Sequence, residues 1–443
     1  MNTLKEFSKK NWWIALLFGM IGQIAWTVEN MYFNLFVFED IAPNLDAVTL
    51  MVQLSGIVAT VATLIAGTLS DKLGNRKKFI AYGYMIWGVT VALFGMISPD
   101  WIGKLFGVSA DTAIQIALVV AVVGDCVMTM FGSTANDAAF NAWVTDNTQA
   151  EFRGKVEGVL ATLPLLSMLV VAGGFGIIVE AVGYTWVFLG LGIVIVACGA
   201  GGLFLVQDSP YLEKKGGFKD ILYGFKPNVI KHNKSLYLNL AIVGVYGVAC
   251  QIFMPYIIIY MKTYLHFTVI EYSIVFGIAI LAGAALNIWF GRIADKMNKA
   301  KLLYIATAIF SVGLLGMWLS NFESHIANLI VFGAFGFVMI TGYILVSALT
   351  GALTRDYTPE QEAGKMQGVR MIFSVFIPMI LGPMIGNAIN KAANIPLENA
   401  GADVMTTAYV PAPEIFLVGG LVALLMYALI PLLVKVIEKE KQE

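Results

Sequence analysis

Twelve long apolar runs constrain the fold of this chain more than any other feature. Each run is long enough to cross a hydrocarbon core of ~30 Å, which takes about 20 helical residues. Because the runs are continuous and lack the short alternation of a membrane barrel, the sequence predicts an all-α membrane protein. The twelve predicted transmembrane helices cover residues 12–38, 47–70, 79–98, 114–143, 156–179, 185–206, 236–261, 269–291, 301–320, 326–353, 366–390 and 413–437.

Composition and the placement of basic residues support this interpretation. Hydrophobic residues make up 58% of the chain and charged residues only 13%, far from ordinary soluble usage. With alternating spans, 25 of the 28 Lys and Arg residues fall on the side of the N-terminus, and only Lys104, Lys262 and Lys391 fall on the other. Basic loops stay in the cytoplasm, so we expect a multi-pass cell-membrane protein with both termini cytoplasmic and no nucleic-acid partner.

The chain repeats itself internally. The segment Gly67-Thr-Leu-Ser-Asp71-Lys-Leu-Gly-Asn-Arg76-Lys returns 224 residues later as Gly291-Arg-Ile-Ala-Asp295-Lys-Met-Asn-Lys-Ala-Lys. A second pair, which begins at Asp146 and again at Asp356, has an offset of 210. The repeat predicts two six-helix bundles, residues 1–207 and 236–443, joined by a cytoplasmic loop at 208–235. The two offsets differ by 14 residues, which places a difference between the halves in spans 3 and 4 and the loop joining them.

Within the polar loop, apolar residues at helix-like spacing allow either a short amphipathic helix or a simple tether. These residues are Phe218, Ile221, Leu222 and Phe225.

Three acids lie inside predicted spans, where each ionisable group costs ~3 kcal/mol or more. Glu29 lies on span 1, and Asp125 and Asp137 lie on span 4. Asp125 and Asp137 are about 18 Å apart along a helix, too far to share one proton. We expect these acids to couple transport to a cation, Asp137 first among them; the alternative is hydrogen bonding that only holds the bundle together.

Amide and aromatic side chains accompany the acids and suit a hydroxyl-rich solute. Amides bond hydroxyl groups, while aromatic rings stack on the apolar face of a sugar. The predicted solute-binding residues are Gln23, Trp26, Asn30, Asn34, Asp125, Asn136 and Asn141 in the first half and Gln251, Tyr256 and Arg370 in the second.

No motif predicts an enzyme. The chain has no metal-ligand cluster, no nucleophile-base arrangement and no phosphate-binding glycine loop, and its three cysteines lie in apolar segments. We therefore expect no metal and no cofactor beyond a coupling Na⁺ or H⁺. We also expect a functional monomer.

The duplicated loop resembles the G-x-x-x-D-K-x-G-x-R-K motif that lies between spans 2 and 3 of the major facilitator superfamily. The resemblance implies the fold of that superfamily, alternating access, and a cytoplasmic gate latch formed by Gly67, Asp71 and Arg76, with Gly291 and Asp295 in the second copy. Asn298 and Ala300 replace the glycine and arginine of the motif there, so a weaker second latch is expected.

Span 4 points to a branch of that superfamily. The segment Asp137-Ala-Ala-Phe140-Asn141-Ala, followed by Asp146 and Arg153, resembles the glycoside–pentoside–hexuronide:cation symporters, of which melibiose permease is one, with Ala139 in place of their proline. The span 2 aspartates of those sugar symporters are absent. The resemblance implies symport of a sugar or glycoside with H⁺ or Na⁺; the alternative is an exporter or a carrier of lysolipid-like amphiphiles. Ser347 stands at the place equivalent to Asp137, so coupling should belong to the first half.

Overall fold

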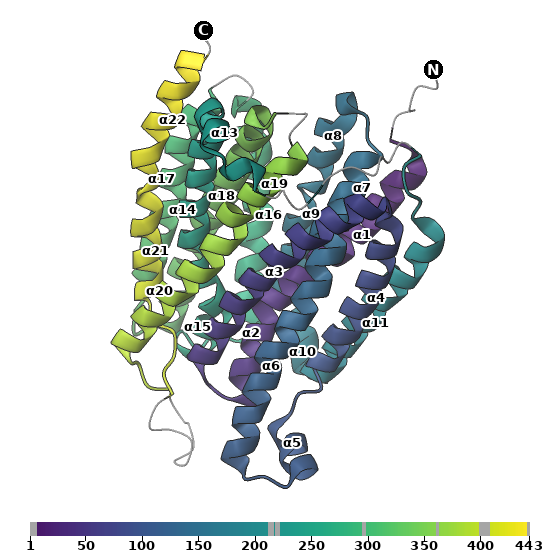
Figure 1. The fold of residues 1–443 in the computed structure, drawn as a ribbon. Helices are drawn as coiled ribbons and strands as arrows, with labels where there is room; N and C mark the ends of the chain where they lie inside the picture. Colours follow the sequence, from purple (N-terminus) through teal and green to yellow (C-terminus); the bar gives the residue numbers. More distant parts are fainter. Residues whose placement is uncertain are drawn as a thin grey trace. The chain divides into compact units, whose positions relative to one another are not determined.

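The structure is a computed structural model that describes residues 7–210, 217, 222–294, 298–359, 363–397 and 408–440. Figure 1 shows that the described chain is helical, and its one β-type pairing is an isolated bridge between Pro396 and Tyr409. The predicted all-α fold class is therefore confirmed.

The first six spans follow the predicted order. Several contain π-helical segments, labelled η. The elements are α1 Lys9–Val28, η1 Glu29–Phe33, α2 Asn34–Phe36 and η2 Val37–Ile41; α3 Leu45–Leu73; α4 Arg76–Phe94 with α5 Pro99–Phe106; α6 Ala110–Gly132, η3 Ser133–Phe140 and α7 Asn141–Asp146; α8 Ala150–Leu160, α9 Leu163–Val170, η4 Val171–Phe175 and α10 Gly176–Val182; and α11 Tyr184–Leu205.

The second six spans follow two short elements, the 3₁₀ turn η5 Tyr223–Phe225 and the helix α13 Pro227–His232. They are α14 Lys234–Phe253, the 3₁₀ turn η6 Met254–Tyr256 and α15 Ile257–Thr263; α16 Val269–Ala294; α17 Lys299–Trp318; α18 His325–Tyr357; α19 Ala363–Met371, the π segment η8 Ile372–Phe376 and α20 Ile377–Ala393; and α21 Glu414–Leu424 with α22 Met426–Glu440.

Eleven helical stretches in the described part of the chain are long and apolar enough to cross a membrane, and the bent pair of α4 and α5 raises the count to twelve if it forms one span. The predicted all-helical membrane architecture is therefore confirmed, with eleven to twelve spans. Within the bent pair, α5 turns away from α4 by 85°.

The chain divides into two compact units. One consists of residues 1–42 and 54–221, and the other of residues 43–53 and 222–443. The short stretch 43–53, which includes the first turns of α3, therefore clusters with the second unit, although the sequence places it in the first half. Contacts with residues far away in the sequence decide this grouping. The pattern of apolar residues does not encode such contacts.

The loop between the halves is described only in part. Residues 211–216 and 218–221 lie outside the described residues, so Phe218 and Ile221 of the expected amphipathic helix cannot be placed. The described end of the loop packs against the second unit, where Tyr223 and Tyr237 contact a core formed by Leu236, Leu240, Met366 and Val369.

Close helix contacts inside each unit depend on glycine. A Cβ at Gly192 of α11 would lie 2.5 Å from the Gly88 carbonyl oxygen of α4, and a Cβ at Gly313 of α17 would lie 2.3 Å from the Met339 nitrogen of α18. Small residues allow such backbone approach between membrane helices, where packing rather than the hydrophobic effect favours association. These contacts set the distances between α4 and α11 in the first unit and between α17 and α18 in the second.

Candidate functional site

Two buried carboxyl groups on different spans lie within electrostatic range of each other in the first unit. Glu29 begins the π segment η1 of span 1 and is 6% exposed, while Asp125 on α6 is 2% exposed. The Thr129 hydroxyl donates to Glu29 Oε1 over 2.8 Å, and the Ser55 hydroxyl donates to Asp125. The negative charge of Asp125 acts directly on Glu29, which makes the two a carboxyl pair between spans 1 and 4.

The carboxyl pair is under-satisfied. Glu29 Oε2 and Asp125 Oδ1 are buried and accept no hydrogen bond, and among the described residues neither carboxyl group has a salt-bridge partner. An ionised carboxylate is only an acceptor, whereas a protonated one supplies a donor. The carboxyl pair therefore lacks a positively charged partner or a hydrogen-bond donor for its unpaired oxygens.

Asp137 lies in the π segment η3 and is half-buried. The Ser133 hydroxyl and the Trp26 indole lie beside its carboxyl group, but neither Ser133 Oγ nor Trp26 Nε1 completes a hydrogen bond of normal geometry. Asp137 also acts on Glu29 electrostatically, less strongly than Asp125 does. The three predicted coupling acids therefore interact electrostatically, because the charges of Asp125 and Asp137 both act on Glu29.

Aromatic rings form a wall next to these acids. The ring centroids of Trp26 and Trp87 are 5.0 Å apart, and Tyr84 meets Trp87 edge-on at 5.4 Å. Gly132 makes room for both indoles, because a Cβ there would lie 2.8 Å from Trp87 and 3.0 Å from Trp26. The indole N–H groups of Trp26 and Trp87 have no acceptor. Trp26 is partly exposed, so this wall can meet a solute through that residue.

Asn136 is buried in a hydrogen-bonded chain between spans. Its Nδ2 donates to the Tyr84 hydroxyl over 2.6 Å, and that hydroxyl donates to the Phe18 carbonyl oxygen over 2.8 Å. The structure thus gives this predicted solute-binding residue an internal partner. Sequence reasoning missed Tyr84, although its place one turn before Trp87 on α4 was a usable signal.

Three other predicted amides bond to their own helices. Asn30, Asn34 and Asn141 donate to the carbonyl oxygens of Trp26, Asn30 and Asp137 over 2.7, 2.9 and 3.1 Å. Asn34 is buried with Oδ1 unpaired, whereas Asn30 and Asn141 are exposed and keep their oxygens for other partners. Gln23 is half-buried on α1.

The three residues predicted in the second half are spread over its unit. Tyr256 is fully buried; its hydroxyl lies 2.7 Å from Thr49 Oγ1 and donates to the Pro383 carbonyl oxygen over 3.0 Å. Gln251 is half-buried against Gly382 of α20, and Arg370 is exposed at the end of α19. These three residues therefore do not line one common site in the described part of the chain.

The first duplicated loop is an ion-pair cluster around Arg76. The Arg76 side chain, 5% exposed, bonds Asp71, donates from Nε to Asp146 over 3.0 Å and from Nη1 to Ser70 Oγ over 2.5 Å. Asp208 accepts from the backbone N–H groups of Arg76 and Lys77 at the start of α4, both over 2.9 Å, where an anion is favoured. Predicted latch residues Asp71 and Arg76 are thus brought together, while Gly67 faces open space.

The second duplicated loop forms a more exposed pair. Lys299 Nζ lies 2.6 Å from Asp356 Oδ2, and the two side chains are 37% and 45% exposed. Asp295 lies outside the described residues, and Gly291 is described only as part of the backbone of α16. Asp356 is the repeat partner of Asp146, so both units pair this aspartate with a cation at the start of span 3 or 9. The internal repeat was the signal that could have identified Asp146 as a partner of Arg76.

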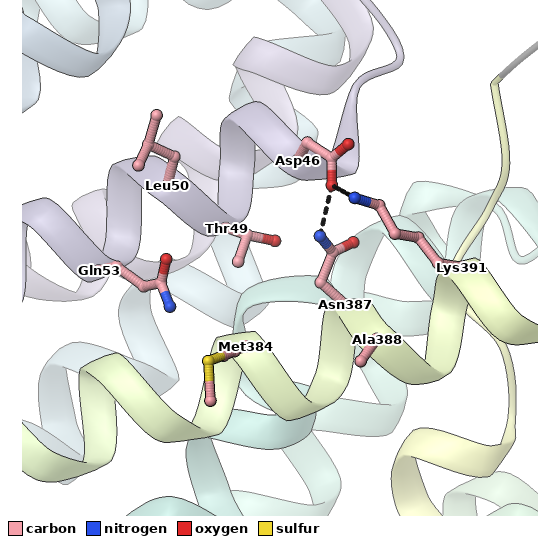
Figure 2. A pocket seen from close by; sticks show the side chains of 8 residues that line it. All are labelled: Asp46, Thr49, Leu50, Gln53, Met384, Asn387, Ala388 and Lys391. Atoms are coloured by element: carbon pink, nitrogen blue, oxygen red, sulfur yellow. Dashed lines mark hydrogen bonds and ion pairs between the residues drawn. The ribbon is translucent and has the colours of Figure 1, made fainter.

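A separate pocket of about 430 Å³ lies in the second unit, and Figure 2 shows the side chains that line it. Asp46 Oδ1 lies 2.6 Å from Lys391 Nζ and accepts from Asn387 over 2.5 Å. The Tyr409 hydroxyl bonds both Asp46 and Asn387. Burial and the Asp46 carboxylate raise the pKa of the Tyr409 hydroxyl, so it remains a donor. Every polar group of this network has a partner, and the network fixes the start of α3 to α20.

A metal site would require several ligand side chains close together. Among the residues that the structure describes, no three His, Cys, Asp or Glu side chains are grouped so that they could hold a metal ion.

Comparisons with known proteins agree on the fold. The family model described as Major Facilitator Superfamily matches residues 12–383. A solved structure of the nucleoside transporter NupG is similar, with a TM-score of 0.62, 10% identity and coverage of 95% of this chain and 99% of that one. An inward-facing bacterial homologue of the iron transporter ferroportin gives a TM-score of 0.66 and 11% identity, with 96% and 98% covered. A sequence search of curated proteins finds no match.

Proposed function

Because the chain belongs to the major facilitator superfamily, we propose that this transporter carries a sugar or glycoside together with a cation, H⁺ or Na⁺. In this proposal the solute and the ion move in the same direction by alternating access across the cell membrane, with both termini in the cytoplasm and a single chain as the working unit. The identities of 10 and 11% to solved transporters carry the fold alone. The solute and the ion are therefore argued from the residues of this chain.

The observation that carries the proposal is the carboxyl pair of Glu29 and Asp125. Two carboxylates without a counter-ion repel each other strongly where the effective dielectric constant is low. A proton or cation that enters the pair removes this repulsion and satisfies the unpaired oxygens, Glu29 Oε2 and Asp125 Oδ1. Binding of the ion would then favour the states in which the site is closed from water, which is the thermodynamic requirement for coupling.

The solute class is supported by the groups near Asp137. Trp26 offers a partly exposed indole, and Asp137 offers a half-buried carboxylate. A flat apolar face next to acceptors and donors matches a sugar ring with its hydroxyl groups. Asn30 and Asn141, both exposed, add amide oxygens on the same two spans.

The resemblance to the glycoside–pentoside–hexuronide:cation symporters rests on the same stretch of span 4, Asp137 to Asn141. We propose this branch for the chain. One of the similar structures is that of a nucleoside transporter, and nucleosides are glycosides, so that solute class belongs among the first to be tested. The comparisons do not favour an exporter or a carrier of lysolipid-like amphiphiles.

Transport by the purified protein in liposomes tests the proposal. A panel of glycosides, free sugars, nucleosides and amino acids would be offered under an inward H⁺ gradient, an inward Na⁺ gradient or no gradient. We expect saturable uptake of a glycoside or sugar that one ion gradient raises above the equilibrium level. Uptake of amino acids alone would overturn the solute class, and uptake that never exceeds equilibrium under either gradient would overturn symport.

Asp137→Asn separates the roles of the acids. If Asp137 couples the ion, this variant should bind or exchange the solute yet lose gradient-driven accumulation by tenfold or more. Full accumulation by Asp137→Asn would leave coupling to the pair of Glu29 and Asp125.

A further inference from the structure

Helix α5 is an element that only the first unit possesses. It lies between the end of α4 at Phe94 and the start of α6 at Ala110, whereas the equivalent connection in the second unit runs directly from Trp318 to His325, a stretch that is fully described. This connection accounts for most of the 14-residue difference between the two repeat offsets. The duplication therefore marks α5 as a structural difference between the two units.

The geometry of α5 places it across the end of span 3. Pro99 starts the helix, Gly107 ends it with a left-handed φ of +64°, and its axis is turned by 85° from that of α4. A helix nearly perpendicular to a membrane span lies nearly parallel to the membrane plane. Because α4 is the third span, α5 lies on the membrane side opposite the N-terminus.

The sides of α5 differ in character. Ile102 is buried, and a Cβ at Gly103 would lie 3.5 Å from the Ala113 side chain, so this side packs on α6. Trp101, Leu105 and Phe106 flank Ile102 and are 60%, 57% and 63% exposed.

The charged side chains of α5 lie on the opposite side. At about 100° per residue, Asp100 and Lys104 point away from the Ile102 side. The helix is amphipathic, and part of its apolar arc is not covered by the protein.

We propose that α5 is an interfacial helix that docks into the lipid headgroup and upper acyl-chain region of the leaflet opposite the N-terminal side. Lipid is the occupant that fits, because Leu93 in the last turn of α4 and Met96 just after it are also exposed, and exposed apolar side chains at the end of a membrane span meet lipid. Tryptophan is enriched at this depth, and an amphipathic helix with a polar outer face lies in the interface plane.

Docking of α5 holds one end of span 4. The same helix α6 that receives Ile102 carries Asp125 and continues into η3 with Asp137. Lipid contact at α5 thus fixes the depth of the helix that bears two of the three membrane acids. This role does not depend on which solute or ion the protein carries.

Fluorescence quenching in liposomes tests the docking. The signal of Trp101 is obtained as the difference between the wild-type protein and Trp101→Phe, both reconstituted in phosphatidylcholine. Lipid brominated near the headgroup should quench this signal at least twofold more than aqueous iodide does. A Trp101 signal that iodide quenches and brominated lipid does not would overturn the proposal.

Spin labels on opposite faces of α5 give a second readout. A nitroxide on Leu105→Cys should collide mainly with oxygen, which partitions into lipid, and one on Lys104→Cys mainly with a water-soluble nickel complex. The protein without an introduced cysteine supplies the background of Cys126, Cys198 and Cys250. Water-dominated collisions at both positions would overturn the proposal. Spin–spin broadening at Leu105 that disappears on dilution with lipid would do the same, because it would identify a second copy of the chain as the occupant.

Discussion

At the scale of single residues, Glu29 and Asp125 receive their hydrogen bonds from neighbours on other spans, and these bonds leave each carboxyl group partly unsatisfied. Glu29 takes one hydrogen bond from Thr129, one hundred positions later, and leaves its second oxygen unpaired beside Asp125. A buried polar atom without a partner is uncommon and costs about 1–3 kcal/mol. Such a cost is characteristic of functional sites, where it can be relieved by a ligand or an ion.

The carboxyl pair predicts a pH-dependent effect of Glu29→Gln on stability. At alkaline pH both wild-type carboxyl groups tend to ionise and repel, so the amide should raise the melting temperature of the detergent-solubilised protein there, by about 1 °C per kcal/mol of repulsion removed. At pH 5 the two proteins should melt together. Glu180→Gln on the exposed surface of α10 is the control. Equal shifts at both pH values would exclude repulsion as the cause.

The two repeat-related ion pairs differ in burial. Arg76 is nearly inaccessible and bonds Asp71, Asp146 and Ser70, whereas Lys299 and Asp356 are both substantially exposed. Water screens the exposed pair, while the buried guanidinium is held by several charge-assisted bonds. The ion pairs at equivalent positions of the repeat are therefore expected to contribute unequally to stability.

We expect Arg76→Met to destabilise the protein by about 1.5–3 kcal/mol, because it removes the charge-assisted hydrogen bonds to Asp71 and Asp146, whose side chains are 42% and 25% exposed. Lys299→Met should cost about 1 kcal/mol or less. Chemical denaturation followed by tryptophan fluorescence measures both. A larger loss for Lys299→Met than for Arg76→Met would contradict this ranking of the pairs.

At the scale of elements, π-helical segments recur where the polar residues lie. Glu29 begins η1, and Asn136 and Asp137 lie in η3. A π turn inserts an extra residue into the helix and shifts the following side chains around it, and such turns occur often at functional sites. In the structure the Glu29 carboxyl group points towards span 4, where it accepts from Thr129.

A glycine contact also holds α4 and α11 of the first unit together. Gly192→Ala would place a methyl group 2.5 Å from the Gly88 carbonyl oxygen, so α4 and α11 must separate, at an expected cost of about 1–3 kcal/mol. Gly190→Ala on the same helix has nothing within 4 Å and should leave the melting temperature unchanged or raise it. Equal melting temperatures for the two variants would show that this contact adapts without loss.

At the scale of the whole molecule, the duplication and the basic residues define a topology that can be tested. Lys104 on α5 and Lys72 at the end of α3 are both exposed, and we expect them on opposite sides of the membrane because one predicted span separates their loops. In intact cells a membrane-impermeant maleimide should label Lys104→Cys, and should label Lys72→Cys only after permeabilisation. The reverse pattern would place both termini outside. The protein without an added cysteine provides the background.

The sequence by itself determined the class of the protein and its plan. Apolar length predicts the spans, the duplicated loops predict two halves, and acids inside spans predict Glu29, Asp125 and Asp137 as candidates for function. These properties are local, because the bilayer requires each span to satisfy its own backbone and to be apolar over a fixed length.

Only the tertiary structure decided which residues meet. It paired Glu29 with Thr129 and Asp125, brought Asp146 and Asp208 to Arg76, placed Asn136 in an internal chain with Tyr84, and joined residues 43–53 to the second unit. These partners depend on the rotation and depth of each helix, which π segments, glycine contacts and the 85° turn before α5 set across long sequence separations. No pattern within one span encodes them.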